Sequence, residues 1–104
     1  MTNRVPLVKE DAGQVGWDCI WKMKLPAAVG AFDLEMPAGA DIILVETQAE
    51  APTLWARFPA INAKNMVTRK FMFVGTGHSF PETAVHVASW QSPPSTLHLF
   101  EIMP

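Results

Sequence analysis

The amino-acid sequence predicts an all-β fold: a compact single-domain β-sandwich or partly open barrel of about seven short, mainly antiparallel strands. The first observation is a period of two, in which apolar and polar residues alternate as in half-buried strands. The second is that the nine prolines and six glycines fall mostly between the alternating segments. The third is that no segment sustains the 3.6-residue period of an amphipathic helix. A chain of 104 residues has the size of one domain and can bury a core.

Three predicted strands occupy the first half of the chain. Residues 17–26 alternate cleanly, with Trp21 and Met23 on one face. Residues 32–37 repeat the pattern in miniature. Residues 40–48 are apolar on both faces at their centre, so we expect this strand to be covered on two sides.

Two further strands are separated by the only plausible long loop in this part of the chain. Pro52 is expected to break the third strand, and alternation resumes in residues 53–58. Residues 59–65 lean polar and predict the loop. Residues 67–75 enter polar, turn apolar and form the fifth predicted strand.

The last two predicted strands form a hairpin. The alternation in residues 83–90 places Ser89 on the face opposite His86 and Trp90. Two adjacent prolines cannot lie inside a strand ladder, so the following QSPPS must be a turn. Residues 96–102 then close the sheet.

Charge and cysteine content exclude several functions. Eight Lys or Arg against ten Asp or Glu give a net charge of −2, whereas binding long nucleic acid usually requires a basic balance. Cys19 is the single cysteine, so no internal disulfide can form. Its apolar surroundings favour a small buried hydrophobe over a nucleophile.

The N-terminal residues predict an arm and not a leader sequence. Residues 1–16 have no clear period and no apolar stretch of the export-signal type, so we expect a flexible arm before a single β domain at 17–104. The longest aliphatic run, residues 42–45, is too short to span a bilayer. A soluble intracellular protein without a membrane partner is therefore expected.

The stretch FVGTGHSFP at 73–81 is the clearest candidate for chemistry. A dinucleotide fingerprint needs glycine where Phe80 stands and a helix afterwards, and a P-loop needs a lysine that is missing here. The serine is also not placed as in a nucleophile elbow. A strand-end bulge is therefore favoured, with positive φ allowed at both glycines. A ligand-contacting loop is the alternative, and it would consist of Gly75, Thr76, Gly77, His78 and Ser79.

No catalytic or metal-binding set can be assembled from the sequence. His86 and His98 lie on neighbouring strands and should share a face, but two imidazoles do not make a zinc site. His78 would join them only if its loop folded over that face. No pair of carboxylates shows the contrasting environments that acid–base catalysis needs. We expect no cofactor, no metal and no enzymatic activity.

Several of the four tryptophans and six phenylalanines are expected to fill the core. Trp55 and Trp90 are the two tryptophans for which exposure is considered, because Trp55 alternates against the core positions of its strand and Trp90 adjoins a turn. An exposed tryptophan would anchor a partner protein or a stacked base. The near-neutral charge favours a protein or a small ligand over long nucleic acid.

The order of these segments resembles a family of small, uncharacterised bacteriophage and prophage proteins known as a domain of unknown function. The resemblance covers roughly residues 18 to 102 and rests on three motifs. These are Ile20-Trp21-Lys22, the turn at Met36, Pro37 and Gly39, and Gly75-Thr76-Gly77-His78. The resemblance implies a phage-encoded protein that acts in the cytoplasm of an infected bacterium, and it carries no activity or cofactor.

Three hypotheses follow. The first is a non-enzymatic module that binds a host or phage protein, with a minor virion component as a variant. The second is a binder or sponge for a small ligand such as a nucleotide signal, using the loop 75–79 with Arg57, Arg69 or Lys70. The third, an enzyme, is disfavoured. A flat apolar face with Trp55 or Trp90 would favour the first, and a concavity shared by the loop and the basic residues the second. A homo-oligomer stays open.

Overall fold

The computed structural model describes residues 14–26 and 30–103 and confirms the all-β prediction. Within these ranges the chain forms seven strands and one short 3₁₀ helix. They are β1 (Asp18–Lys24), β2 (Gly30–Pro37), β3 (Asp41–Gln48), β4 (Ala51–Pro59), η1 (Ala60–Asn62), β5 (Met66–Gly75), β6 (Val85–Ser92) and β7 (Ser95–Ile102). Most of the predicted N-terminal arm, residues 1–13, lies outside the described ranges. No helix in the described ranges has the length and apolar character needed to cross a membrane.

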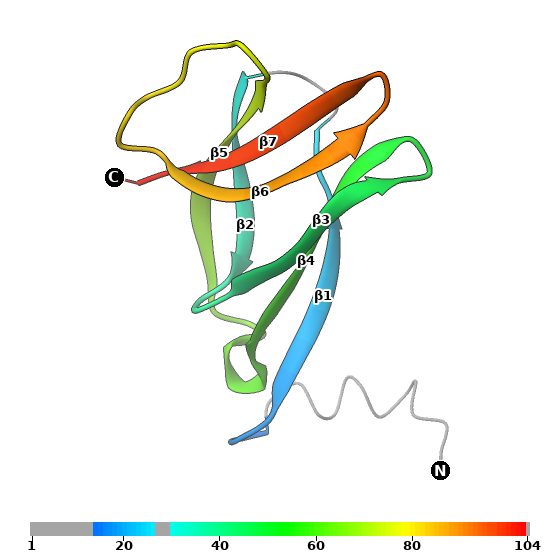
Figure 1. The fold of residues 1–104 in the computed structure, drawn as a ribbon. Coiled ribbons are helices and arrows are strands. Elements are labelled where there is room, and N and C mark those ends of the chain that lie inside the picture. Colours follow the sequence, from blue (N-terminus) through cyan, green and yellow to red (C-terminus); the bar gives the residue numbers. More distant parts are fainter. Residues whose placement is uncertain (1–13, 27–29, 104) are drawn as a thin grey trace.

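The strands make two antiparallel sheets that face each other (Figure 1). Sheet A has the order β1-β4-β3, and sheet B has the order β2-β5-β7-β6. The sheets meet along β3 and β6, where Trp90 Nε1 donates a hydrogen bond of 3.1 Å to Thr47 Oγ1 and Thr47 Oγ1 donates one of 2.9 Å to Ser92 Oγ. They do not close into a barrel.

The facing sides of the two sheets enclose the core. β4 directs Leu54, Ala56 and Phe58 inward, and all three are at most 1% exposed. Trp21 of β1 meets Phe58 edge-on, with ring centroids 4.7 Å apart. The other buried members of the core are Leu25, Met36, Ala40, Val45, Phe71, Phe73, Trp90 and Leu99. Complete burial of such a side chain stabilises the fold by about 1.5–3 kcal/mol, so the apolar residues of the inner faces contribute strongly to stability.

Two residues form the loop of the β3–β4 hairpin. Ala49 and Glu50 have φ of 51° and 66°, the positive values that a type I′ turn needs and that match strand twist. The turn therefore precedes Pro52, which lies inside β4. The expectation that Pro52 breaks the strand was wrong. The other two predicted connections are confirmed: η1 lies in the loop 59–65, and Pro93-Pro94 joins β6 to β7.

A β-bulge changes the environment of β3. The register with β4 shifts between Ile42 and Leu44, and Ile43 and Leu44 are 51% and 44% exposed. β3 is also an edge strand, and the face of it turned away from sheet B is open to solvent. The prediction that residues 40–48 are covered on two sides was therefore wrong, because an extra residue in a bulge breaks the alternation and both faces then read as apolar.

A second bulge lies in β6. The register with β7 shifts between His86 and Ala88, so Val87 is the extra residue. The bulge brings Ser89 to the same side as His86, and not to the opposite side as the sequence alternation predicted. Ser89 is paired directly with His98 of β7.

Candidate functional site

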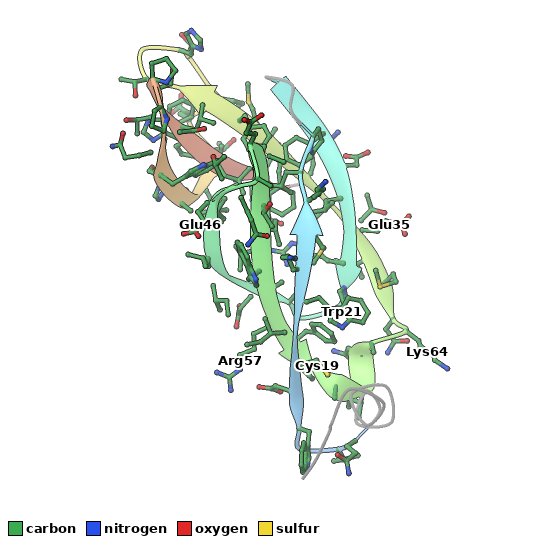
Figure 2. The ribbon with its side chains drawn as sticks, turned by 90° about the vertical axis from the view of Figure 1, so that its right-hand side faces the viewer. Cys19, Trp21, Glu35, Glu46, Arg57 and Lys64 are labelled. Carbon is green, nitrogen blue, oxygen red and sulfur yellow. The ribbon has the colours of Figure 1, made fainter. Side chains whose placement is uncertain are left out.

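The outer face of sheet A, turned away from sheet B, carries three of the exposed large apolar side chains of the described residues, Ile20, Ile43 and Leu44. Strand register places one row of side chains across it, from Lys22 through Trp55 to Leu44. In Figure 2, Arg57 and Glu46 project from this face, whereas Trp21 and Cys19 point toward sheet B. The face comprises Asp18, Ile20, Lys22 and Lys24 of β1, Thr53, Trp55 and Arg57 of β4, and Asp41, Ile43, Leu44, Glu46 and Gln48 of β3.

Apolar side chains are concentrated in the middle of this face. Trp55 is half-buried on the central strand. Ile20 on one neighbouring strand is 57% exposed, and Leu44 on the other is 44% exposed. Residues directly or diagonally opposite on adjacent strands touch or nearly touch, so the three form one band with Ile43 at its edge. Contiguous exposed apolar surface of this kind marks an interaction site more often than isolated apolar residues do.

Charged residues surround the band. Arg57 Nε donates a hydrogen bond of 2.8 Å to Asp18 Oδ2, and both side chains are well exposed. Lys22 Nζ reaches over the central strand and donates to Gln48 Oε1 at 3.1 Å. Lys24 on β1 and Glu46 on β3 take part in none of the ion pairs found among the described residues. Arg57 was predicted as a contact residue and does lie on this face.

Trp90 is not an exposed anchor. It is 8% exposed, its ring packs edge-on against Phe73 with centroids 6.0 Å apart, and its Nε1 is held by Thr47. The suggestion that Trp90 contacts a partner was therefore wrong. Trp90 points inward from β6, because it is paired with Leu97 on the core side of β7.

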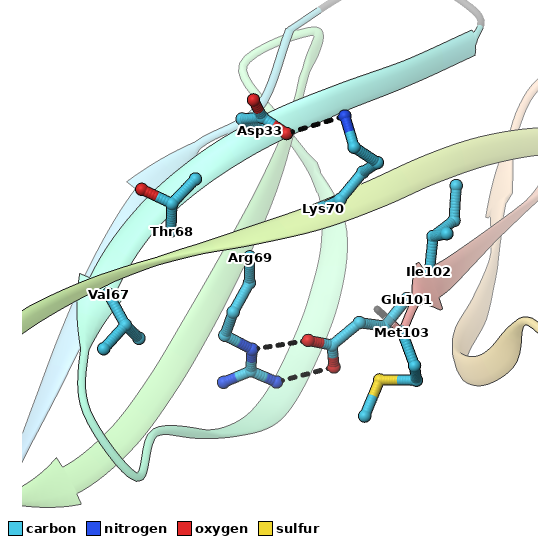
Figure 3. A pocket seen from close by; sticks show the side chains of 8 residues that line it. All are labelled: Asp33, Val67, Thr68, Arg69, Lys70, Glu101, Ile102 and Met103. Carbon is cyan, nitrogen blue, oxygen red and sulfur yellow. Dashed lines mark hydrogen bonds and ion pairs between the residues drawn. The ribbon is translucent and has the colours of Figure 1, made fainter.

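Arg69, the other predicted basic contact, is used inside the fold (Figure 3). Its Nε and Nη2 donate hydrogen bonds of 2.7 Å to the two carboxylate oxygens of Glu101, and its Nη1 donates to the carbonyl of Ala40 at 2.7 Å. The hydrogen bond to Glu101 raises the pKa of Arg69, and burial opposes that rise. Because Arg69 is held on both sides, it is not available to an anionic ligand.

An open groove of about 670 Å³ lies beside this ion pair. Its other cation, Lys70, is 2.9 Å from Asp33, so the two basic residues of the groove are each matched by a carboxylate (Figure 3). The groove therefore presents no excess of positive charge.

The predicted loop 75–79 begins with a tight turn. The backbone N–H of His78 donates to the carbonyl of Gly75 at 3.1 Å, and Gly77 has φ of 95°. That combination is typical of a type II turn, which needs glycine at its third position. Gly75 does not adopt positive φ, contrary to the prediction. An added Cβ there would lie 3.3 Å from the His78 ring, so Gly75 provides room and not an unusual backbone.

The loop does not meet the basic residues that the ligand hypothesis assigned to it. A hollow beside it is lined by Phe73, Gly75, Thr76, His78, Pro94, Ser95, Thr96 and Leu97, a set without lysine or arginine. Arg69 is six residues away along β5, roughly 20 Å at the rise of a strand, and Arg57 lies on the outer face of sheet A. Ser79 is exposed.

A hydrogen-bonded chain of four side chains crosses the outer face of sheet B. Thr76 Oγ1 lies 3.0 Å from His98 Nε2, Ser89 Oγ lies 2.7 Å from His98 Nδ1, and His86 Nε2 lies 2.8 Å from Ser89 Oγ. The expectation that His86 and His98 share a face is confirmed. The sequence analysis missed Ser89 because it had no signal for the bulge at Val87.

These four hydrogen-bonded side chains lack a group that a hydrolytic triad requires. In hydrolytic triads a carboxylate orients the histidine through the nitrogen that does not face the serine, and here the hydroxyl of Thr76 occupies that place. The described residues contain no group of three His, Cys, Asp or Glu that could hold a metal ion. We interpret these hydrogen bonds as a structural network that ties the loop to β6 and β7.

The loop itself is fixed to the same face. The rings of Phe80 and Phe100 lie with their centroids 4.2 Å apart, and His86 meets Phe100 edge-on at 5.3 Å. The outer face of sheet B is thus partly covered by residues of the chain, whereas Ile20 and Leu44 of the band on sheet A are exposed.

Comparison with known proteins gives one match. A family model described as a domain of unknown function, DUF7352, matches residues 18–103. No curated protein matches the chain. No solved structure matches it either.

Proposed function

The chain belongs to the DUF7352 family of domains of unknown function, and we propose that it is a non-enzymatic protein-interaction module whose contact surface is the outer face of sheet A. The observation that carries this proposal is the exposed apolar band of Ile20, Trp55 and Leu44. The partner is a polypeptide of the bacterial host or of the phage that the sequence resemblance suggests, encountered in the host cytoplasm or in the virion.

The layout of the face supports this function. Protein interfaces have an apolar centre that loses water and a polar rim that stays wet. Trp55 lies on the central strand, where a tryptophan contributes most to binding. Asp18, Arg57 and Glu46 surround it. The strands beneath are paired across the full sheet, so the side chains are presented on a rigid support.

Two other functions have less support. A ligand sponge needs positive charge near the loop 75–79, and the described lining of that hollow contains none. A hydrolase of the Ser-His-Asp type orients its histidine with a carboxylate, and in the hydrogen-bonded chain of His98 the hydroxyl of Thr76 is in that place. Binding of a polypeptide at the outer face of sheet A requires neither positive charge near the loop nor a catalytic base.

Site-specific photo-crosslinking in bacterial cells that express the protein tests the proposal. A photoreactive amino acid at Ile20 lies on the band, and one at Glu35 of β2 lies on the opposite side of the molecule (Figure 2). We expect a covalent adduct with a second polypeptide from position 20 and none from position 35. Substituting Trp55→Ala in the chain labelled at position 20 should remove most of that adduct.

The matched positions make the experiment decisive. Both residues are exposed on strands, so the label should leave the fold intact at either place. Equal adducts at the two positions would indicate non-specific capture, and an adduct at position 35 alone would place the contact on sheet B. Either result would contradict the proposal.

A further inference from the structure

We propose that the polypeptide bound at the outer face of sheet A is a second copy of this chain, packed face to face about a two-fold axis that runs along β4. This inference rests on the proposed function, because it names the partner of the same surface. Three features of the face support it: the central position of Trp55, the separation of charge between its edges, and the heights at which opposite charges stand.

The strand order places opposite charges on opposite edges. β1 contributes Lys24 at one edge of sheet A, and β3 contributes Asp41 and Glu46 at the other, whereas the ammonium of Lys22 extends from β1 over the central strand to Gln48. Adding Asp18 and Arg57, the face carries three basic and three acidic side chains, so two copies can approach without net repulsion between their faces.

The charge pattern selects one of two symmetric arrangements. In an isologous dimer the same patch meets itself. An axis across the strands would lay β1 over β1 and β3 over β3, bringing like charges together. An axis along β4 lays β1 of one copy over β3 of the other, and Lys24 of one copy then meets Glu46 of the other at both edges. Trp55 lies on the axis in the second arrangement and packs against Trp55 of the other copy.

The register fixes which charges meet. Lys24 and Glu46 are both paired with Thr53 of β4, so they stand at the same height on opposite edges. Rotation about an axis along the strands preserves height. Lys24 of each copy therefore faces Glu46 of the other, and the contact forms twice. Stacked sheets lie about 10 Å apart with strands within roughly 30° of each other, which the long side chains of lysine and glutamate can bridge.

The centre of the face is compatible with this packing. Arg57 also lies near the axis and would approach its own copy, but it already holds Asp18 at 2.8 Å. Each guanidinium thus carries a counter-charge into the contact.

The size of the face sets the expected affinity. Three strands of seven to nine residues cover roughly 15 by 25 Å at ordinary strand spacing and rise, or about 400 Å² for each copy. This is below the buried area of standard stable complexes, about 800 Å² per partner. We therefore expect a reversible dimer with a dissociation constant in the micromolar range or weaker.

Sedimentation equilibrium of the purified chain over a wide concentration range tests the inference, with three variants. Lys24→Glu and Glu46→Lys each replace the two attractive contacts with repulsive ones, and each should weaken dimerisation about tenfold or more. The double variant Lys24→Glu with Glu46→Lys restores unlike pairs and should recover the dimer. An equimolar mixture of the two single variants should form a mixed dimer. Both residues are exposed, so these variants should fold normally, which circular dichroism checks.

The outcomes separate this inference from the proposed function. A crosslinked adduct of twice the chain mass from position 20, together with the charge-swap pattern, supports both. A chain that stays monomeric while position 20 captures a different polypeptide overturns the second-copy inference and leaves the interaction module standing. A dimer that neither single variant weakens uses another surface and also overturns the inference. Absence of any adduct from position 20 overturns the proposed function itself.

Discussion

The guanidinium of Arg69 and the carboxylate of Glu101 form two hydrogen bonds of 2.7 Å on the inner side of sheet B. The pair joins β5 to β7, and a third bond from Arg69 to the carbonyl of Ala40 ties both strands to the start of β3. The Arg69 guanidinium also lies 5.6 Å from the ring centroid of Phe71. A charged pair thus closes one end of an otherwise apolar sandwich.

Removing the carboxylate from this pair should destabilise the fold. Glu101→Gln leaves a largely buried arginine without its counter-charge, and we expect the free energy of unfolding to fall by about 2 kcal/mol. This is less than for a fully buried pair, because the side chains are 23% and 14% exposed. Urea denaturation followed by tryptophan fluorescence measures the change.

The exposed pair between Lys70 and Asp33 is the control. Its side chains are 51% and 58% exposed, so Asp33→Asn should change stability by no more than about 0.5 kcal/mol. Equal losses for the two variants would show that the bidentate pair has no special structural role.

The Arg69–Glu101 pair should not make stability depend on pH in the ordinary range. Because the pKa of Arg69 is raised, its contribution to the free energy of unfolding is complete below arginine's ordinary pKa and is lost only as pH rises through the folded-state value. That window lies far above neutral pH, so Arg69 should add no pH dependence to stability near neutral pH.

The two glycines of the loop should respond differently to alanine. Gly77 has φ of 95°, a conformation that disfavours a side chain, so Gly77→Ala should destabilise the protein by about 1–2 kcal/mol. Gly75 has no such φ, and its added methyl would meet only the exposed ring of His78. Because that ring can move, Gly75→Ala should be within about 0.5 kcal/mol of the native protein. Thermal unfolding of both variants checks the order, and a larger loss at Gly75 would refute it.

Substitutions of Trp55 on β4 and Trp90 on β6 should differ in their effect on stability, because the first lies on the surface and the second in the core. Trp90→Phe removes the hydrogen bond to Thr47 and leaves a void beside Phe73, so we expect a loss of about 2 kcal/mol. Trp55→Thr keeps a strand-forming residue at a half-exposed position and should lose less than about 1 kcal/mol. Chemical denaturation measures both. A larger loss for Trp55 would mean that it supports the fold and is not poised for a partner.

The sequence predicted the elements of the fold well and the candidate site in part. The alternation around Trp21 and Met23, and the turn at Pro93-Pro94, followed from local chemistry alone. Exposure did not. Trp55 and Trp90 were equal candidates in the sequence, yet one lies on an open face and the other in the core. No partner for Arg69 could be identified from the sequence, because its counter-charge Glu101 lies on a distant strand that pairs with β5 only in the folded sheet.

What the sequence by itself determined is the set of strands, because period two, proline and glycine act within a few residues of each other. Only the tertiary structure decided which strands became edges and which faces were left open. Pairing between distant segments sets strand order, and a single extra residue, Ile43 in β3 or Val87 in β6, reverses the side chains that follow it. For that reason the row of Lys22, Trp55 and Leu44 emerges only when three strands from separate parts of the chain are brought side by side.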